Sequence, residues 1–136
     1  MTTTLSTQDQ ATIRTAAYGT VTLMSIAGIA GSAHKIATDG SLAFAAATGT
    51  VGHVLAGAKA KELKFPGKSA AAIAEQVLPA ITESVRLLEA QEPAEAENFR
   101  STIRIAVEAA TRAHKGAPSP VMAEMTRKID QALNAA

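Results

Sequence analysis

The chain has 136 residues, which suits one domain that buries its own hydrophobic core without a disulfide or a structural metal. Hydrophobic residues make up 47% of it and charged residues 18%, and this composition excludes a disordered chain. The net charge of +1 provides no field that would attract nucleic acid, and the lack of cysteine excludes disulfides, thiol catalysis and cysteine-ligated zinc. We therefore expect a single globular domain over residues 1–136 that does not bind nucleic acid.

Alanine supplies 31 of the residues, and alanine is the best helix former because it loses no side-chain entropy. Aromatic residues make up only 3% of the chain, so the core offers little shape for gripping a flat aromatic ligand. The first ten residues lack the basic region and the apolar stretch of a secretion signal. We expect a cytoplasmic, helix-rich protein without a cofactor.

The first half of the chain is predicted to form two long helices. A capping-box pattern opens the first of them, which we place over residues 7–31. The turn dipeptide Asp39-Gly40 then precedes a second helix over residues 41–63, where apolar residues recur at helical spacing. Pro66 ends this second helix, because proline disfavours helical backbone in the residue before it.

The second half is predicted to form three amphipathic helices. The first covers residues 69–90 and contains Pro79, which either kinks that helix or splits it in two. Pro93 opens the next helix, over residues 93–115, and Ser119-Pro120 opens the last one. No segment shows the two-residue alternation of a half-buried strand. The sequence therefore predicts an all-α fold, a compact bundle of about five helices.

Charged residues are distributed unevenly along the chain. Of the 13 basic and 12 acidic residues, only four lie among the first 58 positions and 21 come after them. A helix without charge on any side is buried on more than one side, so the first two helices are predicted to form a central apolar hairpin. The rest of the domain, a second copy of the chain, or lipid could bury this hairpin. For lipid, residues 15–34 and 40–58 approach the ~20 residues of a membrane span, but both stretches are rich in small and polar residues.

Small residues recur along the predicted second helix, at Ala45, Gly49, Gly52 and Ala56. On one helix face they would leave a shallow groove in which another helix could pack closely. Glycine inside a helix costs about 0.5–1 kcal/mol relative to alanine, so its recurrence indicates a packing interface, unless it only weakens the helix. His53 lies in the same segment, either as a hydrogen-bonded core residue or as the lining of a pocket between the first two helices.

Gly67, Lys68 and Ser69 come nearest to a ligand-binding motif. A phosphate-binding loop needs a glycine where this chain has Glu62, and it needs a strand before it, so nucleotide hydrolysis is not expected. The free amides at the start of the following helix, together with Lys68, predict at most a weak anion site. The three histidines are too far apart in sequence to place two ligands on one helix face, so we predict neither a metal site nor catalytic residues.

These observations favour a small non-enzymatic helical protein that acts by binding, most simply as a homo-oligomer joined through its first two helices. A membrane-associated protein that uses residues 15–34 and 40–58 is the alternative. A ligand-binding protein or an enzyme with a pocket near His53 is the third hypothesis.

Overall fold

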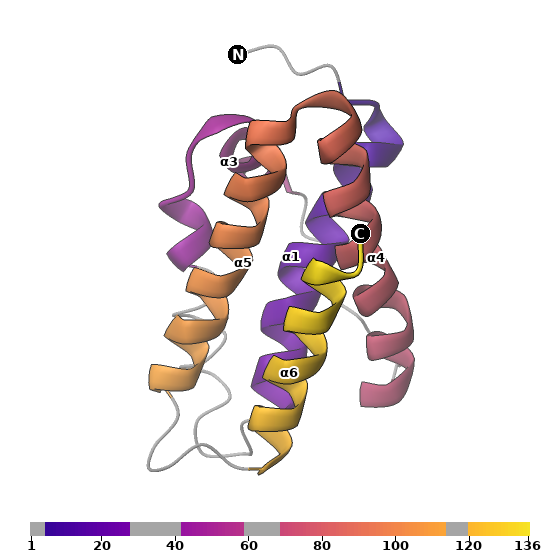
Figure 1. Cartoon of the computed structure of the whole chain (residues 1–136). Helices are drawn as coiled ribbons and strands as arrows, with labels where there is room; N and C mark the ends of the chain where they lie inside the picture. The colour runs from indigo at the N-terminus through magenta and orange to yellow at the C-terminus, as the bar shows by residue number, and fades with distance from the viewer. Residues whose placement is uncertain (1–4, 28–41, 59–68, 114–119) are drawn as a thin grey trace.

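A computed structural model describes residues 5–27, 42–58, 69–113 and 120–136, which form a compact bundle of helices (Figure 1). These residues contain no strand, so the predicted all-α fold is confirmed. A short helical turn covers residues 42–45. The longer helices are α1 (Thr7–Ala27), α3 (Gly49–Ala56), α4 (Ala70–Gln91), α5 (Pro93–Ala113) and α6 (Pro120–Asn134).

The central helix of the bundle is α1, which packs against α3, α4, α5 and α6. In Figure 1 it runs through the middle of the bundle, with α5 on the left, α6 in front of its lower part and α4 on the right. Ile13, Leu23 and Met24 are fully buried, and Ile26 is the one large apolar side chain of this helix that is exposed. The other helices of the domain thus cover the apolar surface of α1, which explains why its sequence carries so few charges.

Helices α1 and α4 approach each other closely at Gly19. A Cβ atom built at this glycine would lie 2.3 Å from Cγ2 and 2.9 Å from Cγ1 of Val77. Non-bonded carbon atoms prefer separations of about 3.5–4.0 Å, so the space at this crossing admits only a hydrogen atom. Glycine is therefore required here by packing and not by backbone conformation.

The boundaries of α4, α5 and α6 follow local signals. The hydroxyl of Ser69 caps α4, because its Oγ accepts a hydrogen bond of 3.1 Å from the backbone N–H of Ala72. Pro93 and Pro120 occupy the first helical positions of α5 and α6, where a missing N–H costs nothing. Pro79 lies inside α4 on its exposed side, and the helix continues through it. The alternative in which this proline splits the helix is therefore wrong.

The structure corrects the prediction of one continuous helix over residues 41–63. Residues 46–48 are not helical. The helix that follows them, α3, has eight residues and ends at Ala56. Thr48 has extended backbone (φ −122°, ψ 177°), and Gly49 has a φ of +72°, a left-handed conformation that glycine adopts without a steric penalty. Residues 59–63 lie outside the part of the chain that the structure describes.

The break places α3 at the periphery, against α1 and α5, so the predicted central hairpin of two long helices is not confirmed. The spacing that suggested the second helix, at Phe44, Thr48, Val51 and Leu55, nevertheless identified three buried positions. Phe44, Val51 and Leu55 are 3%, 0% and 1% exposed, whereas Thr48 is exposed. The helical turn over residues 42–45 and helix α3 both direct these apolar residues toward the core. They are therefore buried although the chain is not helical between the two segments.

Candidate functional site

Side chains from the junction of α4 and α5 and from the first turn of α5 hold the N-terminus of α3. The N-cap residue Thr48 makes no side-chain capping bond. Instead Oε1 of Glu95 accepts a hydrogen bond of 2.9 Å from the backbone N–H of Val51, and Oε1 of Glu92 accepts one of 3.1 Å from the hydroxyl of Thr50. A carboxylate at this position satisfies a free helix amide and faces the positive end of the helix dipole.

Side chains from α1 hold the opposite end of α3. Nε of Arg14 donates a hydrogen bond of 2.8 Å to the carbonyl of Val54, and the hydroxyl of Tyr18 donates one of 3.0 Å to the carbonyl of Leu55. Burial raises the pKa of Tyr18, and the positive charge of Arg14 opposes this effect. An acidic group at the N-terminus and a basic group at the C-terminus match the dipole, so α3 is fixed at both ends by other helices.

Residues 42–58 carry no Lys, Arg, Asp or Glu, and much of their surface is exposed. Leu42 is 62% exposed, and Ile105 on α5, which lines a hollow together with Ala43 and Ala46, is 50% exposed. We call the exposed side of residues 42–58, together with Ile105, the α3 face. It contains two hollows that share Ala47 in their linings, with volumes of about 330 Å³ and 200 Å³. No charged residue lines either hollow.

Three of the four residues predicted to form a packing interface lie together. Ala45, Gly52 and Ala56 line the larger hollow of the α3 face. Gly49 does not line this hollow. It lies against Glu95 instead, and a Cβ atom on it would be 2.8 Å from Oε2 of that residue. A Cβ atom on Gly52 would be 2.4 Å from the carbonyl oxygen of Ala47, so this glycine allows the preceding non-helical residues to pack against α3.

The remaining predicted site residues are dispersed. His53 is exposed and does not line the hollow between α3 and α1. Ser69 uses its hydroxyl as the cap of α4. Gly67 and Lys68 lie outside the residues that the structure describes, so the weak anion site stays a prediction.

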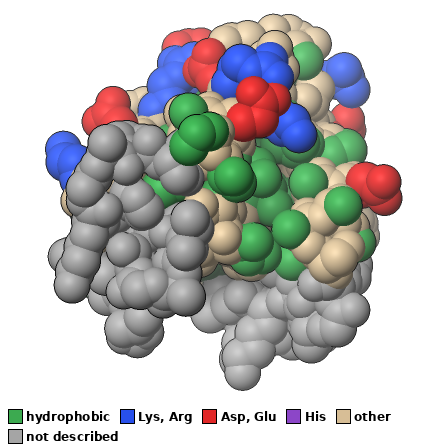
Figure 2. Space-filling view, turned by 90° about the horizontal axis from the view of Figure 1, so that it is seen from below, with side chains coloured by type: hydrophobic (Ala, Val, Ile, Leu, Met, Phe, Trp, Pro, Cys, Tyr) green, Lys and Arg blue, Asp and Glu red, His purple; other side chains and the backbone are tan. Residues whose placement is uncertain are grey.

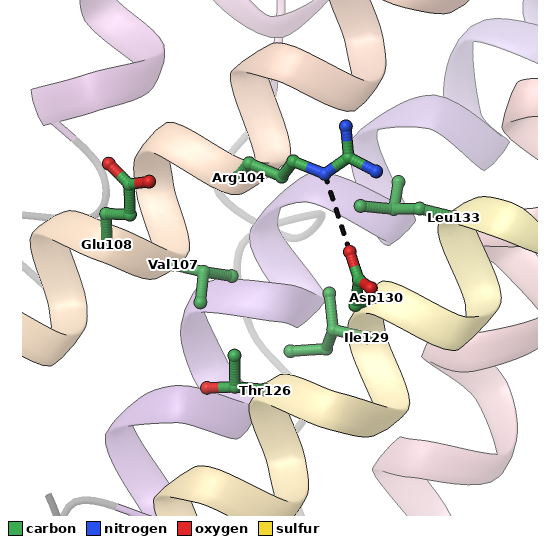
Figure 3. A pocket seen from close by; sticks show the side chains of 7 residues that line it. All are labelled: Arg104, Val107, Glu108, Thr126, Ile129, Asp130 and Leu133. Carbon is green, nitrogen blue, oxygen red and sulfur yellow. Dashed lines mark ion pairs between the residues drawn. The ribbon is translucent and has the colours of Figure 1, made fainter.

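A groove between α5 and α6 was not foreseen from the sequence (Figure 3). Its volume is about 150 Å³. Nε of Arg104 on α5 lies 3.4 Å from Oδ1 of Asp130 on α6, so this ion pair crosses one end of the groove. The lining residues are Arg104, Val107, Glu108, Thr126, Ile129, Asp130 and Leu133. Only tertiary packing brings these two helix faces together, so no local sequence signal reveals the groove.

The end of the bundle that lies lowest in Figure 1 carries a central group of hydrophobic side chains, with charged side chains gathered along one edge (Figure 2). Ile26 near the end of α1 is 46% exposed, and Val121 at the start of α6 is 57% exposed. Residues 28–41 and 114–119 adjoin these two helix ends in the chain and are not described. We therefore assign no site to this end.

Comparison with protein family models, with curated protein sequences and with solved structures finds no match to this chain. The described residues contain no group of three or more histidine or acidic side chains arranged to hold a metal ion. Within the same residues, none of the helices combines the length and the apolar character required to cross a bilayer. A functional assignment therefore rests on the geometry of the α3 face and of the α5–α6 groove.

Proposed function

We propose that the protein acts by binding and that the α3 face joins two copies of the chain. The observation that carries this proposal is the exposure of Leu42 and Ile105 on a surface whose two hollows have no charged lining. Exposed apolar surface of this kind marks interaction sites on soluble domains. The depletion of charge is typical of the centre of protein interfaces.

A second copy is the partner that this chemistry favours. In a two-fold symmetric dimer each residue of the patch meets residues of the same patch, so a charged surface would repel itself. The α3 face avoids this repulsion because residues 42–58 carry no charge. The small side chains of Ala45, Ala46 and Ala56 also allow two backbones to approach closely.

This proposal moves the association surface away from α1. The sequence suggested that both early apolar segments take part, but α1 is covered by the helices of its own domain. Among the described residues of the first half, most of the exposed uncharged positions lie in residues 42–58, whereas α1 exposes Ile26 near its end. Ala45 and Ala56, two of the residues predicted to form an interface, lie on this surface. Gly52 contributes by allowing Ala47 to pack closely against α3.

Light scattering on a size-exclusion column, over a range of protein concentrations and without detergent, tests the proposal. We expect a mass that rises from 13.9 kDa toward twice that value. Leu42→Glu and Ile105→Glu should each return the mass to that of one chain, because a carboxylate buried in the interface loses its hydration. Val121→Glu is the matched control, since it replaces an equally exposed valine on α6 outside the α3 face.

Two outcomes would contradict the proposal. The first is a mass of 13.9 kDa at every concentration, which would mean that the α3 face meets no second copy. The second is recovery of the chain only with the membrane fraction, which would favour lipid as the partner of residues 42–58. A loss of assembly in the Val121→Glu control would show that the effect of the charge is not specific to the α3 face.

A further inference from the structure

The groove between α5 and α6 combines an apolar floor with a charged rim. Val107 on α5 and Ile129 and Leu133 on α6 form the floor, and all three side chains are less than 8% exposed. Arg104, Glu108 and Asp130 lie at the rim, and all three are exposed. The groove is therefore amphiphilic, with apolar atoms below and ionised groups at the opening.

The rim carries one unbalanced negative charge. The guanidinium of Arg104 is neutralised by Asp130, at 3.4 Å. Glu108 forms no ion pair with any residue that the structure describes, although Arg112 comes one helical turn after it on α5. A ligand that places a positive charge beside Glu108 would complete the pairing at the rim.

The volume limits what the floor can accept. An apolar cavity of about 150 Å³ holds a single six-membered carbon ring. The groove has this volume but is open to solvent on one side, so a ligand can keep a polar group in water while its apolar body is buried. An anionic group in that position would instead meet the carboxylates of Glu108 and Asp130.

We propose that the groove between α5 and α6 binds a small organic ammonium ion whose apolar body has about six or seven carbons. The body lies on Val107, Ile129 and Leu133, and the ammonium group pairs with Glu108. The groove shares no lining residue with the two hollows of the α3 face. The contact is small and half open, and we expect a dissociation constant on the order of 1 mM.

Titration of the full-length, isotopically labelled protein with benzylammonium, followed by amide chemical shifts, tests this proposal. We expect saturable shifts confined to residues 104–108 and 126–133. Benzyl alcohol, which has the same ring but no charge, should bind about two- to five-fold more weakly, the range that one exposed ion pair provides. Benzoate should bind more weakly still.

Variants separate the two parts of the site. Glu108→Gln should weaken benzylammonium about two- to five-fold and leave benzyl alcohol unchanged. Glu75→Gln, which removes an exposed carboxylate from α4, is the matched control and should change neither. Thr126→Leu places a larger side chain in the groove and should weaken every ring-containing ligand, while its amide spectrum reports that the fold persists.

The proposal is overturned if shifts do not saturate, if they spread over the whole molecule, or if benzoate binds as tightly as benzylammonium. An unchanged affinity in Glu108→Gln would also overturn it. Shifts at residues 104–108 and 126–133 that depend on protein concentration without any amine would assign the groove to a second copy of the chain, and this result would likewise refute the ammonium site.

Discussion

Replacement of Gly19 by alanine should destabilise the protein, although alanine is the better helix former. The added Cβ atom would lie 2.3 Å and 2.9 Å from the two methyl groups of Val77 and 3.1 Å from its Cβ atom. Valine in a helix has one strongly preferred χ1 rotamer, and both of its methyl groups are in the way, so rotation gives no relief. The two helices must therefore separate, which costs about 1–3 kcal/mol as overpacking.

The gain in helix propensity offsets only part of this cost, because glycine to alanine in a helix contributes about 0.5–1 kcal/mol. We expect Gly19→Ala to lower the free energy of unfolding by about 1–2 kcal/mol, equivalent to a Tm lower by about 3–8 °C in a domain of this size. Urea and thermal unfolding followed by circular dichroism measure both quantities.

Val77→Ala supplies the internal check. This substitution alone should destabilise the protein by leaving a cavity beside α1, but in the double variant the new methyl group of residue 19 would occupy part of that space. We expect the double variant to be more stable than the sum of the single effects by about 1 kcal/mol or more. If Gly19→Ala is as stable as the parent protein, or if the two effects simply add, the close-contact argument is refuted.

Three further predictions concern local features. Glu95→Ala should destabilise the protein by about 1 kcal/mol and speed hydrogen exchange at Val51, because it removes the cap of α3, whereas Glu75→Ala should leave that exchange unchanged. Tyr18 is the only tyrosine, so absorbance reports its ionisation directly, and its midpoint should lie above the usual value of about 10. Because its pKa is raised in the folded state, the stability from Tyr18 should be complete below pH ~10 and lost as the pH rises through the folded pKa, and a Tyr18→Phe variant should lack this loss. Pro79→Ala restores a backbone donor to the middle of α4 and should raise the free energy of unfolding by about 1 kcal/mol; a lower value would show that the proline is needed for packing.

The elements that could be predicted are those with local signals. Ser69, Pro93 and Pro120 mark the starts of α4, α5 and α6 because capping and the missing proline donor act within one helical turn. The apolar stripes of these helices likewise identified their buried sides. The scarcity of charge in the first 27 residues correctly indicated a helix buried on several sides, and α1 is that helix.

The break before α3 could not be predicted in the same way. A glycine at position 49 is compatible with a helix and with a left-handed turn, and only the packing of Ala47 on Gly52 and the carboxylate of Glu95 decide between them. The acidic residue that caps α3 lies 44 positions away in the sequence. The residue pattern within one helix therefore cannot identify a capping residue that comes from a distant helix.

The groove between α5 and α6 was also beyond local reasoning. Its ion pair joins Arg104 to Asp130, which belong to different helices, and its lining comes from both helices. His53 illustrates a different limit. A histidine in an uncharged segment suggested a buried core residue as one alternative, and this alternative is wrong because His53 is exposed on the short α3.

The attachment of α3 at both ends also sets the order in which the chain can assemble. An eight-residue helix is too short to persist by itself in water, and its capping side chains come from α1 and α5, 40 and 44 positions away. We therefore expect helix α3 to form after α1 and α5 have met, and interactions within it should contribute little to the folding transition state. A chain still emerging from the ribosome would then carry no α3 face until α5 has been synthesised, so neighbouring nascent chains cannot use that surface to recognise one another.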